Sequence, residues 1–133
     1  MTDRDFTVEL EPLENGSFHI RVEGGAEYTA SDPVKMLAAA IGGCLSASLA
    51  HCIRKSRVDA GPVKARVSAR IARSDRGRLR VAGVEVELDP GIAEADRAKA
   101  QRCFGLFEDY CTVSQSIREG FPIGVSVKGF EQA

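Results

Sequence analysis

One long stretch without a permanently charged side chain constrains the fold most. It runs from Met36 to Ile53, between Lys35 and Arg54, and reads MLAAAIGGCLSASLAHCI. This length is close to the minimum for crossing a bilayer. The stretch is dominated by Ala, Gly and Ser, however, contains His51, and lies between amphipathic strands that need an aqueous fold. We therefore expect a buried central helix and no membrane partner.

The residues around this stretch predict the neighbouring elements. Ser31 or Asp32, followed by Pro33, provides an N-cap and a first-turn proline for the helix. Before it, alternating apolar residues on both sides of Asn15-Gly16 predict a β-hairpin, which Gly24-Gly25 ends. After it, two more alternating segments, 63–71 and 84–88, predict a second hairpin.

The last third of the chain predicts a helix and a strand. An apolar stripe at helical spacing predicts a helix from soon after Asp89-Pro90-Gly91 to about Tyr110. Ile123, Val125 and Val127 alternate with other residues and predict a final strand. The resulting order, β-β-long helix-β-β-helix-β, predicts an α+β fold in one domain, residues 1–133. A helix that is apolar all round is hard for so short a chain to cover, so we expect a homodimer.

Charge and the N-terminus limit the possible partners. Lys plus Arg number 18 against 19 Asp plus Glu, which gives no reason to expect nucleic acid or an anionic membrane as a partner. The N-terminal residues MTDRDFTVEL lack the apolar core of a secretory signal. A small-molecule partner and a cytoplasmic, reducing location are therefore predicted.

Four cysteines carry the possible chemistry. Cys44, Cys52, Cys103 and Cys111 include no C-x-x-C pair, and the two histidines lie far apart in sequence, so neither a metal site nor a cofactor is expected. The chain has enough apolar residues to fold without covalent cross-links, so a structural disulfide framework is not expected. Cys52 and Cys103 lie in no motif and are expected to be core residues.

The other two cysteines have different surroundings. Cys111 precedes a segment, 112–117, that favours a short helix, whose N-terminal amides would stabilise a thiolate. Cys44 lies inside an apolar helix, where burial raises a thiol pKa unless a cation lies nearby. The residues alone leave open whether either sulfur is reactive or only fills space.

Two motifs resemble those of one family. The segment DPVKMLAAAIGGCL, residues 32–45, resembles the central-helix motif of the OsmC/Ohr family, and Cys111-Thr112-Val113-Ser114-Gln115 resembles that family's Cys-Pro-Val-Ser motif. The resemblance implies a curved antiparallel sheet wrapped around a long buried central helix in an intertwined homodimer. It also implies an active site at the interface between the two subunits.

The resemblance further implies an activity. Cys44 matches the cysteine that attacks an organic hydroperoxide, and Cys111 the cysteine that then closes a disulfide, which an external dithiol must reduce. Arg21-Val22-Glu23-Gly24 is similar to the family's Arg-Phe-Glu-Gly, which makes Arg21 the expected activating cation. Apolar pocket walls are expected from Met36, Leu37, Phe104 and Phe107, suited to alkyl or lipid hydroperoxides.

The sequence departs from the family pattern at two positions. Val34 stands where the family commonly has a glutamate that holds the arginine, so Arg21 needs another carboxylate, such as Glu23, Glu27 or one from the second subunit. Thr112 replaces the proline of the second motif. Two alternatives to a peroxidase follow: a redox-sensing or apolar-ligand-binding OsmC-like protein, and a structural domain with inert cysteines.

Overall fold

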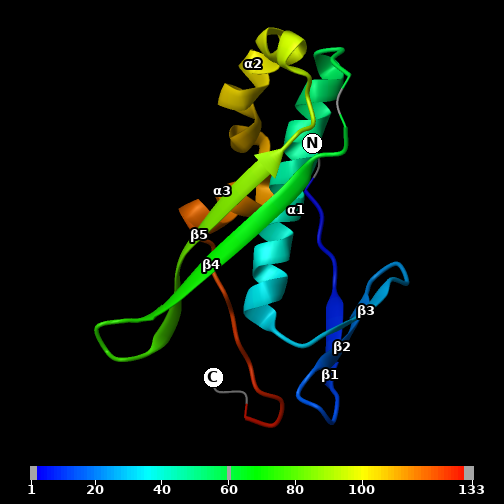
Figure 1. The fold of residues 1–133 in the computed structure, drawn as a ribbon. Helices are drawn as coiled ribbons and strands as arrows, with labels where there is room; N and C mark the ends of the chain where they lie inside the picture. Colours follow the sequence, from blue (N-terminus) through cyan, green and yellow to red (C-terminus); the bar gives the residue numbers. More distant parts are fainter. Residues whose placement is uncertain (1–2, 60, 131–133) are drawn as a thin grey trace. The chain divides into compact units, whose positions relative to one another are not determined.

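The computed structural model describes residues 3–59 and 61–130 and has the predicted α+β class (Figure 1). Its strands are β1 (Val8–Pro12), β2 (Phe18–Val22), β3 (Glu27–Ala30), β4 (Lys64–Arg73) and β5 (Leu79–Asp89). Its helices are α1 (Pro33–Lys55), α2 (Arg97–Leu106) and α3 (Thr112–Glu119), with short 3-10 helices η1 (Glu94–Asp96) and η2 (Phe107–Tyr110).

The described residues form two compact units. One contains residues 3–40 and 67–86, and the other contains 41–59, 61–66 and 87–130. Helix α1 and the β4–β5 hairpin each contribute residues to both units. The expectation of one domain over residues 1–133 stays a prediction.

The N-terminal strands form an antiparallel sheet in the order β1-β2-β3. Its register places Leu10 and Tyr28 on either side of Ile20, which is the buried residue of β2. Cross-strand apolar neighbours of this kind stabilise a sheet face. The first predicted hairpin is therefore confirmed.

The third strand of this sheet was not expected from the sequence. Gly24 and Gly25 have φ values of 100° and 105°, a conformation that side chains with a Cβ rarely adopt. They form a turn in which the Val22 amide donates to the Ala26 carbonyl at 2.8 Å. These glycines thus reverse the chain into β3 and do not end the sheet.

The long helix begins as predicted and spans the whole apolar stretch. The Asp32 carboxylate accepts hydrogen bonds from the amides of Val34 and Lys35, at 2.9 and 3.3 Å, which caps the N-terminus of α1. Ile41, Leu45, Leu49 and Ile53 recur every fourth residue and form one buried stripe.

By length and composition alone, α1 could cross a membrane, although the core helix of a soluble protein passes the same test. Only 28% of its most apolar window is buried. The expectation of a fully covered helix therefore holds for one stripe of α1 and not for its whole circumference in this single chain.

The main core lies in the unit that contains the second half of α1. Leu49, Ile53 and Val58 pack with Ala100 and Cys103 of α2. Figure 1 shows α2 beside the C-terminal turns of α1. This packing fixes the segment that leads from α2 through η2 to Cys111.

The expected final strand is wrong for this chain. Residues 121–127 have no regular secondary structure, and Ile123 and Val125 are 78% and 84% exposed. In the described residues, β4 and β5 form a sheet of only these two strands. The alternating apolar residues therefore have no strand to pair with and no face to cover, although their pattern is that of a strand.

Candidate functional site

Cys44 and Cys111 meet in the same compact unit. Cys44 lies in the middle of α1 and is half-buried, and Cys111 is the fully buried residue that precedes α3. The two sulfurs lie close enough for each to shift the pKa of the other. Both cysteines are free, so the two sulfurs form a reduced pair of neighbouring thiols.

The surroundings shift the pKa values of the two thiols in opposite directions. Burial raises the pKa of Cys44, and the nearby Cys111 adds to this increase, while amide hydrogen bonds from Val113 and Thr112 oppose it. Burial also acts to raise the pKa of Cys111. There, the nearby Ser114 hydroxyl and amide, Cys44 and the Val113 amide together outweigh burial, and the pKa is lowered. The pair therefore holds its first negative charge on Cys111.

The start of α3 is what stabilises this charge. The amides of Val113 and Ser114 help to lower the pKa of Cys111, as expected where the free N–H groups of a helix N-terminus lie near a thiolate. The Ser114 hydroxyl is buried and has no partner of good hydrogen-bond geometry, yet it is close enough to the Cys111 sulfur to lower its pKa. A thiolate at Cys111 would give this hydroxyl a strong acceptor.

A cavity of about 510 Å³ adjoins the thiol pair. One wall follows α1, because residues spaced by three or four positions share a helix face. The other wall comes from the end of α2, from η2 and from the start of α3. Its lining residues are Cys44, Ala47, Ser48, His51, Cys52, Lys55, Leu106, Phe107, Tyr110 and Thr112.

The residues expected to form a pocket lie in different places. Phe107 lines the cavity, whereas Phe104 packs against the core. Met36 and Leu37 lie on the first turns of α1 in the other compact unit and are 38% and 36% exposed. Helical spacing from Cys44 was the signal in the sequence that could have identified the α1 wall, including His51 and Lys55.

Arg21 belongs to the three-stranded sheet. Its guanidinium lies 3.4 Å from a carboxylate oxygen of Glu11, and both side chains are more than half exposed. Glu27, which was expected as a possible partner, instead pairs with His19 at 2.8 Å. In the described residues, no cation contributes to the pKa shift of Cys44.

Val34 has a backbone role. Its amide donates to the capping carboxylate of Asp32, and its apolar side chain accepts no hydrogen bond. Arg21 thus pairs with Glu11 in this chain, in place of the glutamate that commonly follows the proline in the family.

Cys52 and Cys103 are joined by a disulfide, which the sequence did not predict. Their Cα atoms lie 5.7 Å apart and their sequence separation is 51. Both lie in or against the core, as expected, but they link α1 to α2 covalently. The expectation that the chain has no structural disulfide is therefore wrong for this pair.

The family model described as "OsmC-like protein" matches residues 24–126. This range contains both cysteine motifs and most of the chain. The chain belongs to the OsmC-like protein family. No curated protein sequence is significantly similar to it.

Several solved structures have a similar fold. A hypothetical protein from Aquifex aeolicus is 20% identical, with a TM-score of 0.70 over 89% of this chain and 90% of that one. An organic hydroperoxide resistance protein from Elizabethkingia anophelis is 19% identical, with a TM-score of 0.61 over 88% and 90%. The organic hydroperoxide resistance protein OhrB of Bacillus subtilis is 16% identical, with a TM-score of 0.63 over 86% and 91%.

Proposed function

We propose that this OsmC-like protein is a thiol peroxidase that reduces organic hydroperoxides to alcohols. The observation that carries the proposal is the contact between Cys44 and Cys111 at the edge of a largely apolar cavity. Two adjacent free thiols can complete a two-electron reduction without a metal or cofactor. The names of two similar structures, both organic hydroperoxide resistance proteins, agree with this chemistry.

The proposed cycle has three steps. The Cys44 thiolate attacks the distal oxygen of the hydroperoxide, the O–O bond breaks, and the alcohol leaves after taking a proton. The Cys111 sulfur then attacks the Cys44 sulfenic acid, a disulfide forms, and water leaves. An external dithiol reduces this disulfide and becomes oxidised to its own disulfide.

The raised pKa of Cys44 means that its thiolate needs further stabilisation before it can attack. The pKa of Cys44 is raised, so attack requires a cation near Cys44 that stabilises its thiolate and lets its proton pass to Cys111. We propose Arg21 for this role, because its sequence context is similar to the family's arginine and Glu11 can orient its guanidinium.

A homodimer is part of this proposal. Residues 119–130 are exposed throughout and keep the apolar alternation of a strand, and α1 exposes Gly43 and Ala47 beside Cys44. An exposed strand-like segment can add to the edge of a sheet in another chain. Sedimentation velocity of the full chain tests this directly, and a monomer at micromolar concentration would contradict it.

The decisive experiment oxidises the reduced protein. Cumene hydroperoxide is added, the reaction is quenched with acid, and disulfides are located by peptide mapping. A Cys44–Cys111 disulfide within seconds, absent from Cys44→Ser, supports the peroxidase. In Cys111→Ser the sulfenic acid at Cys44 should accumulate and be trapped by dimedone. If no disulfide forms even with excess peroxide, the peroxidase is excluded.

Val34 and the raised pKa of Cys44 favour one alternative, a slow redox sensor or apolar-ligand-binding protein. In that case the same disulfide forms over minutes and turnover with a dithiol is negligible. The rate of the first oxidation therefore separates the two functions.

A further inference from the structure

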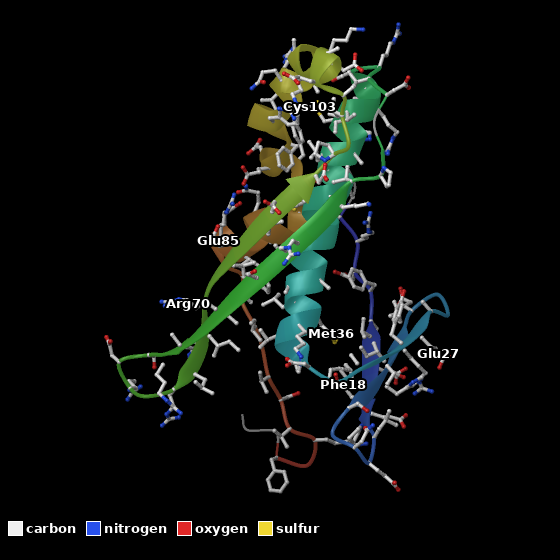
Figure 2. All side chains as sticks on the ribbon, viewed as in Figure 1. Phe18, Glu27, Met36, Arg70, Glu85 and Cys103 are labelled. Atoms are coloured by element: carbon white, nitrogen blue, oxygen red, sulfur yellow. A yellow bond between two sulfur atoms is a disulfide. The ribbon has the colours of Figure 1, made fainter. Side chains whose placement is uncertain are left out.

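The Cys52–Cys103 disulfide stands at the wall of the same cavity as Cys44. Cys52 lies on the face of α1 that lines the cavity, eight residues after Cys44, and Cys103 lies on α2. Figure 2 labels Cys103 on α2, where it faces the C-terminal turns of α1. The proposed peroxidase cycle does not use this pair.

The two sulfurs of this disulfide differ in access. Cys103 is only 1% exposed, whereas Cys52 is half-buried and lines the cavity. Thiol–disulfide exchange requires an attacking thiolate to reach a sulfur atom, so access decides which of the two is attacked. Of the two residues, a thiol in the cavity therefore meets Cys52 and not Cys103.

The leaving sulfur also has a partner. The Ser56 hydroxyl donates to the Cys52 carbonyl at 3.2 Å and lies 3.4 Å from the Cys103 sulfur. By rotating, it can donate instead to a thiolate formed at Cys103. A stabilised leaving thiolate speeds exchange. Access at Cys52 and stabilisation at Cys103 thus favour the same direction of attack.

We propose that Cys52–Cys103 is a second, exchangeable redox couple, in which a small thiol attacks Cys52 through the cavity. The thiolate RS⁻ bonds to the Cys52 sulfur, the Cys52–Cys103 bond breaks, and its electron pair goes to Cys103, which takes a proton from solvent. A second RS⁻ attacks the mixed disulfide and releases Cys52 as a thiolate. The protein disulfide is reduced, and two thiols are oxidised to RSSR.

This couple controls the wall of the cavity. Leu106 and Phe107 follow Cys103 by about one helical turn and line the cavity opposite α1. While the disulfide is closed, α2 is held against α1 and these side chains are fixed. Reduction leaves only noncovalent packing at this point, so binding of an apolar ligand weakens. The effect on turnover, but not the exchange itself, rests on the proposed peroxidase function.

The test of exchange uses Cys44→Ser/Cys111→Ser, so that the second pair is the only one that reacts. The folded variant is incubated with glutathione, quenched with acid and mapped. The mixed disulfide is expected on Cys52, in about tenfold excess or more over Cys103. Ser56→Ala in the same background should slow exchange. Equal adducts on both cysteines, or no exchange until denaturant unfolds the chain, would overturn the proposal.

The test of wall control compares the oxidised and reduced forms of the same variant. Both are titrated with an anilinonaphthalene dye as an apolar probe, after circular dichroism has shown that both are folded. The Kd should rise several-fold on reduction and should not respond to the reductant when Cys52→Ala/Cys103→Ala is added to Cys44→Ser/Cys111→Ser. An unchanged Kd would refute wall control. Because neither test involves Cys44 or Cys111, failure of the peroxidase proposal would leave a positive result here intact.

Discussion

Cys44 of α1 and Cys111 before α3 lie close enough to shift each other's pKa, and the pKa of Cys44 is raised while that of Cys111 is lowered. Cys111 sits at the N-terminus of α3 and is surrounded by donors, whereas Cys44 sits inside α1, where burial dominates. Of the two thiols, Cys111 is therefore the one that loses its proton more easily. In the proposed cycle, a cation near Cys44 has to reverse this order.

The effect of Cys44 on the pKa of Cys111 predicts a difference between two substitutions of Cys44. Cys44→Ser retains a hydroxyl donor for Cys111, whereas Cys44→Ala removes it, so the pKa of Cys111 should be higher in Cys44→Ala. The ultraviolet absorbance of the thiolate, followed against pH, measures this pKa. Identical titrations in the two variants would show that the Cys44 donor does not act on Cys111.

The lowered pKa of Cys111 also predicts a pH dependence of stability. Below its ordinary value of 9.0, this thiol binds fewer protons in the folded chain than in the unfolded chain. Its contribution is therefore full above pH 9.0 and is lost as the pH falls through the folded pKa. Urea unfolding of Cys44→Ser should become harder as the pH rises towards 9.0, relative to Cys44→Ser/Cys111→Ser. An equal pH response in both variants would contradict this.

Ser114 should act on the rate of disulfide closure. Ser114→Ala removes a buried hydroxyl that helps to lower the pKa of Cys111, so less Cys111 thiolate is present to attack the Cys44 sulfenic acid. Disulfide closure should slow several-fold at neutral pH and recover as the pH rises. Ser116→Ala, on the same helix, is the matched control. Stopped-flow mixing with cumene hydroperoxide measures the rate.

Local signals predicted the helix and the first turns of the fold. Asp32 and Pro33 fixed the start of α1, because a cap and a first-turn proline act within a few residues. The Asn15-Gly16 turn and the alternation around it gave the β1–β2 hairpin. The short helix after Cys111 also matched. The contact between Cys44 and Cys111 agreed with the family motifs and could not have come from spacing alone.

Long-range features were missed for physical reasons. Cysteines on separate helices do not reveal their pairing in sequence, so Cys52–Cys103 could not be predicted. The register between β1 and β2 places Arg21 directly opposite Glu9 and therefore diagonal to Glu11, which lies on the same face of the sheet. The pairing of Arg21 with Glu11 depends on this register. The strand pattern around Val125 predicts pairing, but a strand needs a neighbour, and the single chain supplies none among its described residues.

The cross-link between α1 and α2 should contribute measurably to stability. Closing a loop with a sequence separation of 51 restricts the unfolded chain, and this typically adds about 2–4 kcal/mol to the free energy of unfolding. Cys52→Ala/Cys103→Ala should lose about this amount in urea unfolding, and the loss should persist without reductant. Cys44→Ser/Cys111→Ser is the control with an intact cross-link. Equal stability of the two variants would show that the cross-link adds nothing.

The cap of α1 should have a smaller, local effect. Asp32→Ala leaves the amides of Val34 and Lys35 without their acceptor and should destabilise the chain by about 1 kcal/mol. Asp75→Ala, which removes an exposed carboxylate in the turn between β4 and β5, should change stability by less than about 0.5 kcal/mol. Similar losses in the two variants would contradict a specific capping role.

Lys55 predicts a preference among hydroperoxides. It lines the cavity on the same face of α1 as Cys44, about three helical turns away, while the opposite wall is apolar. A long-chain acid with a hydroperoxide in mid-chain can therefore place its carboxylate near Lys55 and its peroxide near Cys44. Because Lys55 is exposed, the attraction is screened, and Lys55→Ala should lower kcat/KM for a fatty-acid hydroperoxide by only about two- to fivefold.

The methyl ester of the same hydroperoxide isolates this charge effect, because it keeps the chain and the peroxide but has no carboxylate. Lys55→Ala should leave kcat/KM for the ester unchanged. Arg54→Ala removes a neighbouring cation that lines a different hollow and should affect neither substrate. Equal losses for acid and ester in Lys55→Ala would mean that the lysine shapes the cavity without recognising the carboxylate. Equal losses for the acid in Lys55→Ala and Arg54→Ala would mean that only the total charge matters.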